Sequence, residues 1–469
     1  MRKLYAGTIG IMAAAAVALT GCGPTASTDS AGVGAGSATQ AGGGAQAGDA
    51  EGDAGEAGGK TKIVYWSNQR HDMDYVQKKV DEFNASNDKN IEVVYEVMSE
   101  NFDNNLELSF QSNQAPDVFR AKSEITPYIK KNMVIPIDKY LTDEDKEVYG
   151  DTLGIQNINM YDGEIYSLPQ FGNTFRLIYN KDVFEKAGLD PEAPPKTMEE
   201  VREYARTITE KLGGEGVYGF AMNLKNSYSA LYRSLDEVAR LSDMFYYDFK
   251  EGKYNFDEYS KIAQVFADMY QDGSFFPGCE SLDIDPLRAQ FALGNIGMYM
   301  SGYWEVSVYD TQFPTEQKWA AAQLPTYDGV VDGVNTINSA GRSFVISSQC
   351  KNPDAAYEFM KFMTSEEYMI DYHEQGYGII VVPSVAAKAK AATAYGAEYF
   401  VLNDTDTIAP LAPEMAGLVI EGKTFYDAFA AVIFGEMNID DAVSQMTESY
   451  NGALEAAVAA GDIEPITAE

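Results

Sequence analysis

The sequence predicts an α/β fold with a parallel β-sheet, and three features near its start lead to this. A β-branched and aromatic run at 61–66 (TKIVYW) has strand character, and apolar residues at helical spacing follow it. A second strand-like run occupies 90–98 (NIEVVYEVM). After another helix, residues 117–119 form a short apolar strand. This β-α-β-α-β order is typical of a parallel sheet with ligands at its carboxyl-terminal edge.

The helices are predicted from spacing and capping signals. Apolar residues recur at helical spacing between 76 and 83. Thr197, with Glu200 three residues later, forms a capping box at the start of another helix. Asn352-Pro353 begins a further helix in the same manner. With no repeat and no later low-complexity segment, the folded part is expected to be one compact, multi-lobed unit.

Composition excludes several classes of protein. A chain of 469 residues suits two or three domains, and 45% hydrophobic residues can fill their cores. The 35 basic and 71 acidic residues give a net charge of −36, which repels nucleic acids and anionic lipid surfaces. Only 2 His and 3 Cys are present, so zinc clusters and a disulfide-rich scaffold are excluded.

The N-terminus has the layout of a secretory signal. Arg2 and Lys3 precede a short, alanine-rich apolar run that ends at Leu19. The sequence 19–22 (LTGC) resembles the bacterial lipobox, which implies that residues 1–21 are a signal peptide and that Cys22 is lipidated. A plain secretory signal with an incidental cysteine is the alternative.

Residues 22–60 are expected to form a flexible tether behind the lipid. From 23 to 60 roughly two-thirds of the residues are Gly, Ala or Ser, and none is aromatic. Such a coil reaches about 30–35 Å. The folded body is therefore expected to be extracytoplasmic and held at the membrane by its lipid alone.

Several sequence blocks occur between residues 115 and 442. They are, in chain order, 115–118 (APDV), 161–169 (YDGEIYSLP), 177–184 (LIYNKDVF), 187–189 (AGL), 294–304 (GNIGMYMSGYW), 324–329 (LPTYDG), 355–359 (AAYEF) and 435–442 (GEMNIDDA). In this order they resemble the family of extracellular solute-binding proteins that feed ABC importers, in particular its carbohydrate-binding branch, similar to maltose-binding protein. Gly297 stands where the family usually has alanine.

The resemblance implies two α/β lobes, joined by a hinge, with the solute held between them. Closure of the lobes over the solute is the expected motion. It places chain crossings near 169–173, 339–342 and 403–408. The implied division is 61–170 for lobe I, 171–340 for lobe II, 341–403 for a return segment of lobe I and 404–469 for C-terminal helices of lobe II.

A sugar needs aromatic planes for its C–H face and directional polar groups for its hydroxyls. Trp66 ends the first strand, and Trp304 lies in the family's Gly-x-Trp segment, so both are predicted to stack on the solute. A core position is the alternative for Trp66, whereas Trp319 lacks such context and is predicted to pack internally. The predicted polar and further aromatic contacts are Asn68, Arg120, Gln170, Asn173, Tyr228, Glu305, Arg342 and Tyr377. A turn or capping role is the alternative for Asn68, and a salt bridge for Arg120.

Other patterns are less specific. Asp283 and Asp285 form a DxD pair, but in so acidic a chain a solvated loop is the better interpretation. The pair Tyr246-Tyr247 resembles that of ferric-ion-binding relatives, yet its aromatic surroundings favour an ordinary insertion in lobe II. Acidic residues are plentiful, but their spacing picks out no glycosidase pair. The two body cysteines, Cys279 and Cys350, fall in different lobes by the resemblance and are predicted to be free thiols. A disulfide between them, in an oxidising compartment, is the alternative.

The sequence therefore predicts a monomeric, lipid-anchored subunit that captures a sugar and delivers it to an ABC permease, with no metal, cofactor or catalytic residue. A different solute (a short peptide, a polyamine or a ferric ion) is the alternative within this class. An anchored secreted hydrolase is the alternative from another class. A binding protein that serves a sensor kinase is the third.

Overall fold

The computed structural model describes residues 59–98, 101–121, 125–336, 344–407, 412–413, 417–463 and 467. The chain divides into two units, 1–57 and 58–469, and the first lies outside the described residues. The predicted signal peptide and Cys22 belong to that unit, and the predicted site residue Arg342 also lies outside the described residues. Within the described ranges, no helix is both long and apolar enough to cross a membrane.

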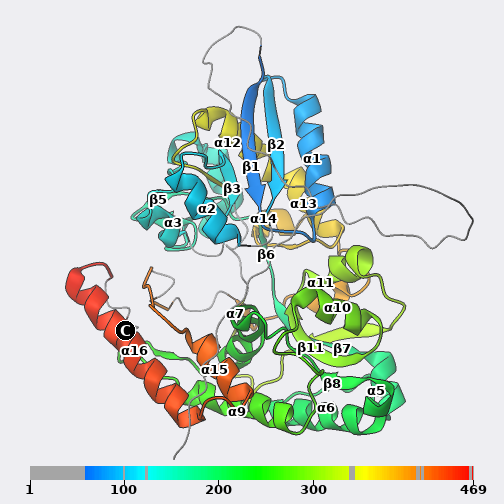
Figure 1. Ribbon diagram of the computed structural model, residues 1–469. Helices are drawn as coiled ribbons and strands as arrows, with labels where there is room; N and C mark the ends of the chain where they lie inside the picture. Colours follow the sequence, from blue (N-terminus) through cyan, green and yellow to red (C-terminus); the bar gives the residue numbers. More distant parts are fainter. Residues whose placement is uncertain are drawn as a thin grey trace, which may run out of the picture. The chain divides into compact units, whose positions relative to one another are not determined.

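The first lobe contains a four-stranded sheet with the order β14-β3-β1-β2 (Figure 1). The strands are β1 (Thr61–Ser67), β2 (Ile91–Val97), β3 (Val118–Arg120) and β14 (Phe344–Ile346). β1 pairs in parallel with β2 and β3, which confirms the predicted parallel β-α-β-α-β unit. β14 is antiparallel to β3 and brings in a segment more than 200 residues downstream.

Helices cover both faces of this sheet because side chains along β1 alternate between two cores. Ile63 and Tyr65 face the core that α1 and α12 complete, whereas Trp66 joins Phe119 in a second core under α2 and α3. The predicted apolar face of α1 is buried. The helices of this lobe are α1 (Met73–Ser86), α2 (Phe102–Gln111), α3 (Thr126–Lys130), α4 (Asp143–Tyr149), α12 (Pro353–Met363), α13 (Glu366–Glu374) and α14 (Pro383–Ala386), and a short ribbon pairs β4 (Met160–Tyr161) with β5 (Glu164–Ile165).

The second lobe contains a mixed sheet with the order β12-β7-β11-β8. β7 is antiparallel to β11 and β12, and β8 is parallel to β11. The strands are β7 (Phe175–Asn180), β8 (Tyr218–Phe220), β11 (Ile296–Gly302) and β12 (Trp319–Gln323), with a separate ribbon of β9 (Tyr247–Asp248) and β10 (Lys253–Tyr254). Trp319 is buried on this sheet, as predicted from the sequence.

Helices enclose the second sheet on both faces. The helices are α5 (Lys181–Ala187), α6 (Met198–Leu212), α7 (Ser227–Leu231), α8 (Glu237–Leu241), α9 (Asp257–Gln271), α10 (Ile284–Ala292), α11 (Glu305–Ser307), α15 (Phe425–Ile433) and α16 (Ile439–Ala460). The predicted capping box of α6 is present: the Thr197 side chain accepts from the Glu200 amide, and the Glu200 side chain accepts from the Thr197 amide. Two π-helical turns, Tyr232–Asp236 and Val308–Gln312, extend the segments that begin with α7 and α11.

Two short strand pairs lie where the chain passes between the lobes. β6 (Phe171–Gly172) pairs with β15 (Ile379–Ile380), and β13 (Asn335–Thr336) pairs with β16 (Asp406–Thr407). The second pair is fixed by a buried polar cluster, in which the Arg176 guanidinium donates to Asp406 at 2.8 and 3.0 Å and Asn335 donates to it at 2.7 Å. Residues Ala397–Phe400 (η6) pack against the core of the second lobe, so the predicted return segment 341–403 is shared between the two lobes.

Candidate functional site

The parallel strands of each lobe end beside one of the two predicted stacking tryptophans. Trp66 is the penultimate residue of β1, and Trp304 follows β11 by two residues. In α/β folds, the carboxyl-terminal strand edge is where backbone groups and loop side chains are free to meet a ligand. The candidate site is therefore built from these two edges and the connections between them.

Trp304 is half-buried and held in one place by three contacts. Its ring lies over Gly302, where an added Cβ would come within 2.5 Å of the ring carbons, so only glycine permits this approach. Its ring meets Phe175 edge-on with centroids 5.7 Å apart. Its indole Nε1 donates to Glu305 Oε1 at 2.9 Å. The sequence therefore presents an aromatic plane in a defined orientation at the end of β11.

Glu305 is fully buried, and its partners are protein groups. Arg288 donates to it through Nε at 2.9 Å and Nη2 at 2.8 Å, and Ser301 Oγ donates at 2.8 Å. Burial opposes ionisation of Glu305, but the Arg288 charge and these hydrogen bonds outweigh it and lower the carboxyl pKa. In this structure Glu305 thus orients Trp304 and does not present its carboxylate to a solute.

Trp66 near the end of β1 and Arg120 at the end of β3 lie at the carboxyl-terminal ends of two neighbouring parallel strands, where Trp66 is paired with Phe119. Trp66 is buried against Phe119, and its Nε1 has no hydrogen-bond partner among the described residues. Arg120 forms a buried ion pair with Asp72 at 2.7 Å, which is the alternative role considered from the sequence. Tyr372 also donates to Asp72 at 2.7 Å. Burial alone would raise the Asp72 pKa, yet Arg120 holds it well below its usual value.

Two predicted amides lie at the first connection between the lobes. Gln170 donates through Nε2 to the carbonyl of Met363, and its Oε1 is buried without a partner in the described part of the chain. Asn173 is 1% exposed, and neither its Nδ2 nor its Oδ1 has a partner there. A buried amide without partners is costly, about 1–3 kcal/mol for each unmet group. These amides therefore have unused hydrogen-bonding capacity.

The remaining predicted residues are more exposed. Tyr228, on α7, is 53% exposed and stacks on Tyr232 with centroids 5.6 Å apart. Tyr377 is half-buried against Tyr75 and Tyr372. Asn68 follows β1 and accepts from Gln69 Nε2 at 2.8 Å. Of the predicted residues, Trp66, Asn68, Arg120, Trp304 and Glu305 lie at or just after strand ends, whereas Tyr228 lies on α7. Arg120 and Glu305 have protein partners.

Sequence reasoning missed Arg233, which lies in the π-helical turn after α7. This guanidinium is 5% exposed and donates to Ser229, to Asn223 Oδ1 at 2.6 Å and to Ser301 Oγ at 3.3 Å. Burial lowers its pKa to about 10, although Glu305 acts in the opposite direction. No local pattern distinguishes this arginine from a surface residue, because its burial depends on a turn that the sequence does not predict.

The less specific patterns have structural roles. Asp283 caps α10 and pairs with Lys225 at 2.9 Å, while Asp285 pairs with Arg70 and Arg288. Among the described residues, no group of three or more His, Cys, Asp or Glu side chains is placed to hold a metal ion. The pair Tyr246-Tyr247 is buried among aromatic side chains.

The two body cysteines are free thiols, as predicted. Cys279 packs in the core of the second lobe, and Cys350 packs against that of the first. They therefore form no disulfide between the two lobes.

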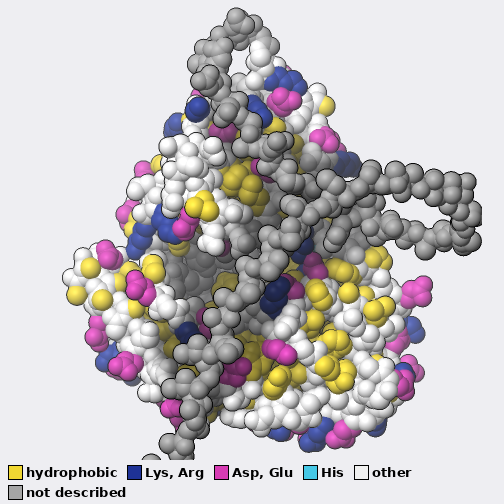
Figure 2. All heavy atoms as spheres, in the orientation of Figure 1, with side chains coloured by type: hydrophobic (Ala, Val, Ile, Leu, Met, Phe, Trp, Pro, Cys, Tyr) yellow, Lys and Arg dark blue, Asp and Glu magenta, His cyan; other side chains and the backbone are white. Residues whose placement is uncertain are grey.

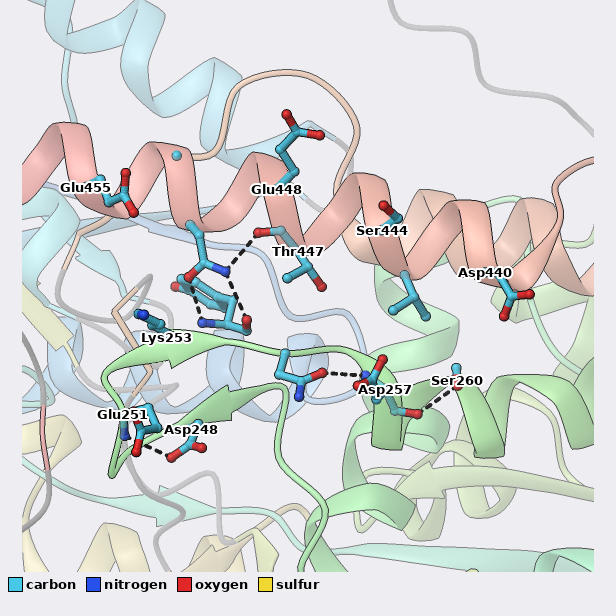
Figure 3. A pocket seen from close by; sticks show the side chains of 15 residues that line it. Asp248, Glu251, Lys253, Asp257, Ser260, Asp440, Ser444, Thr447, Glu448 and Glu455 are labelled. Atoms are coloured by element: carbon cyan, nitrogen blue, oxygen red, sulfur yellow. Dashed lines mark hydrogen bonds between the residues drawn. The ribbon is translucent and has the colours of Figure 1, made fainter.

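A groove of about 970 Å³ lies between α16 and the β9–β10 ribbon (Figure 3). Acidic side chains predominate along it, including Asp248, Glu251, Asp257, Glu448 and Glu455. None of the predicted site residues lines it. On the face seen in Figure 2, acidic and basic side chains are dispersed among neutral ones. The strand-edge site therefore stays the better candidate.

Comparison with known proteins supports the assignment of the fold. Residues 66–370 match the sequence profile of the bacterial extracellular solute-binding proteins. The chain is 22% identical over 415 residues to the galactooligosaccharide-binding protein of Bacillus subtilis, covering 84% of this chain and 90% of that protein. It is 24% identical over 333 residues to the maltotriose-binding protein of Pyrococcus abyssi, covering 70% and 67%.

A solved structure has the same fold at low sequence identity. The ABC-transporter solute-binding protein of Thermotoga lettingae, crystallised with α-D-tagatose, superposes with a TM-score of 0.69 at 20% identity. The match covers 84% of this chain and 100% of the other. Together with the profile match over most of the folded body, the two-lobed α/β architecture shows that this chain belongs to the bacterial extracellular solute-binding protein family.

Proposed function

We propose that the protein captures a neutral mono- or oligosaccharide between its lobes and delivers it to an ABC permease. The observation that carries this proposal is the Trp304 ring, which Gly302 and Glu305 hold at the end of β11. A fixed aromatic plane suits the C–H face of a sugar ring. The names of the galactooligosaccharide- and maltotriose-binding relatives support the same class of solute.

The polar part of the site is proposed to come from the connection between the lobes. Asn173 offers two donors and one acceptor that the described residues leave unused, and Gln170 offers one acceptor. Sugar hydroxyls both donate and accept, so they match this mixed capacity. Trp66, Asn68, Tyr228, Arg342 and Tyr377 are proposed to complete the contacts when the lobes close. Binding without turnover is proposed, because this arrangement needs no acid and nucleophile pair.

The test is a thermal-shift screen of the purified chain against mono- and oligosaccharides, with peptides, polyamines and ferric ion as controls. A solute at about 100 times its Kd adds about 2.7 kcal/mol of stability, which raises Tm by several degrees. Trp304→Ala should abolish the response to the sugar. Tyr395→Ala is the matched control, since Tyr395 is an exposed aromatic residue that packs on Trp319.

Three outcomes would contradict parts of the proposal. A response to peptides, polyamines or ferric ion with none to sugars would refute the carbohydrate class and leave the family assignment intact. Release of product from a bound oligosaccharide would favour the hydrolase. An unchanged response in Trp304→Ala would remove Trp304 from the site.

Arg233 favours a second candidate, a sugar that carries an anionic group. Its hydrogen-bond partners, Ser229, Asn223 and Ser301, are all neutral, and the nearby Glu305 is engaged by Arg288. A buried positive charge is stabilised by an opposite charge in contact with it. Glucuronate and glycerol 3-phosphate in the same screen distinguish the two candidates, because Arg233→Met should weaken binding of these anions far more than binding of neutral sugars.

The anchor is a separate part of the proposal. We propose that Cys22 is lipidated and that 22–60 tethers the body to the outer surface of the cell membrane, where a monomer exchanges its solute with the permease. Cys22→Ser should move the protein from the membrane fraction to the soluble extracellular fraction and abolish incorporation of labelled palmitate. Retention of the variant in the membrane would contradict the anchor without affecting solute capture.

A further inference from the structure

A chain of polar contacts leads from the Trp304 ring to the first lobe. Trp304 Nε1 donates to Glu305, and Arg288 donates to the same carboxylate through Nε and Nη2. Arg288 Nη1 also donates to Asp285 Oδ1 at 3.1 Å, and Arg70 Nη2 donates to Asp285 Oδ2 at 2.6 Å. Each residue shares its partner with the next, so the contacts form one connected network.

The last contact joins the two lobes. Arg70 follows β1 in the first lobe, whereas Asp285 lies in the first turn of α10 in the second. A second contact reinforces it, because Gln312 Nε2 donates to the Arg70 carbonyl at 2.9 Å. Gln312 ends the π-helical turn that follows α11, which is the same segment that begins at Trp304. Arg70 is thus bound to the second lobe through both its side chain and its backbone.

We propose that Arg288 is a positioning residue that couples the Trp304 ring to closure of the lobes through the Arg70–Asp285 bridge. The proposal rests on the proposed function, because it assigns Trp304 to the solute. A solute that orients the Trp304 ring also orients Glu305 and, through it, Arg288. Arg288 then keeps the Asp285 carboxylate within hydrogen-bond distance of Arg70. By reciprocity, formation of the bridge favours the ring orientation that binds the solute.

The two ion pairs of the network differ in burial, and this difference decides which of them breaks and forms again. Glu305 is fully buried and Arg288 nearly so, and such a pair stays formed because breaking it would strand a charge. The Asp285 and Arg70 side chains are 31% and 49% exposed, so water competes for their bridge. The buried Glu305–Arg288 pair therefore transmits the position of the Trp304 ring, whereas the exposed Arg70–Asp285 bridge forms and breaks.

The first experiment measures the coupling without any solute. The chain has three tryptophans, so the indole N–H region of its ¹⁵N spectrum contains three cross-peaks, which Trp→Phe variants assign. Arg70→Gln and Asp285→Asn should each shift the Trp304 cross-peak and leave that of Trp319 in place. Lys225→Gln is the matched control, because it breaks the exposed ion pair between Lys225 and Asp283. That pair also lies at the start of α10, but both of its residues belong to the second lobe. An unmoved Trp304 cross-peak, or an equal shift in Lys225→Gln, would overturn the proposal.

The second experiment measures affinity with maltotriose as the probe. An exposed ion pair is worth up to about 1 kcal/mol, so Arg70→Gln should raise the Kd about two- to fivefold. The effect should vanish near 1 M salt, where the screening length is about 3 Å. In a double-mutant cycle, Arg70→Gln should have no further effect in an Asp285→Asn background. Additive effects of the two variants would overturn the proposal. Failure of maltotriose to bind would bear on the proposed solute alone, since the spectrum decides the coupling independently.

Discussion

The contact between Gly302 and Trp304 predicts that Gly302→Ala strongly weakens solute binding, although the substitution adds only one methyl group. A Cβ at this position would lie 2.5, 2.6 and 2.9 Å from three carbons of the Trp304 ring. Comfortable carbon contacts are about 3.5–4.0 Å, so the ring must move by about 1 Å. The hydrogen bond from Nε1 to Glu305, now 2.9 Å, would then exceed the usual limit of about 3.2 Å.

The magnitude follows from these two effects. Overpacking costs about 1–3 kcal/mol, so the free energy of unfolding should fall by that amount in urea titrations followed by circular dichroism. A displaced ring loses its alignment with the solute, and a loss of about 1.4 kcal/mol in binding is a tenfold rise in Kd. We expect at least that rise in isothermal titration with the sugar found in the screen.

Gly452→Ala is the control for this experiment. Gly452 lies inside α16 with nothing within 4 Å of an added Cβ, so the substitution should stabilise the protein by about 0.5–1 kcal/mol and leave Kd unchanged. If Gly302→Ala lost stability but kept the parental Kd, the argument that Gly302 orients a solute-binding ring would be refuted.

Three further predictions concern buried charges. Arg120→Met leaves Asp72 buried without its cation, so the free energy of unfolding measured in urea should fall by about 3–5 kcal/mol. A variant as stable as the parent would show that the ion pair is dispensable. Burial raises the pKa of Asp236 to about 6 despite the nearby Arg240. The unfolded state therefore binds fewer protons than the folded state, and the stability should fall as the pH rises from about 4 to 6. Asp236→Asn should remove this pH dependence in thermal melts. Burial opposes ionisation of Asp406, but Arg176 and Thr174 hold the pKa of its carboxyl below the usual value. The contribution of Asp406 to the free energy of unfolding is therefore present above about pH 4 and lost below it. Asp406→Asn should flatten the fall in stability at acid pH, and an unaltered fall would contradict this role of Asp406.

Elements with local signals could be predicted from the sequence. The runs at 61–66, 90–98 and 117–119 correspond to β1, β2 and β3, because alternating β-branched and aromatic residues specify strands over short distances. The capping box at Thr197 marks the first turn of α6, and Asn352-Pro353 marks that of α12. The fourth strand of the first sheet, β14, pairs with a segment over 200 residues away, and nothing in its own residues indicates that partner.

For the candidate site, the sequence predicts which residues lie near strand ends, but not which groups those residues contact. Trp304 was found through its motif, whereas the role of the adjacent Glu305 depends on Arg288, which reaches it from another helix. Arg120 was equally open to a ligand or an ion pair until its distance to Asp72 was known. Side-chain partners of charged residues are set by tertiary packing, which sequence spacing does not record.

The burial of the two free thiols has a consequence for chemical labelling. Burial raises the pKa of Cys279 and of Cys350 to about 12, so almost none of either thiol is ionised near neutral pH. Alkylating and maleimide reagents attack the thiolate, which makes the native body nearly inert toward them. A single cysteine introduced on the surface of each lobe would therefore take up fluorophores or spin labels selectively. The opening and closing of the lobes can then be followed in solution against a background that needs no cysteine removed.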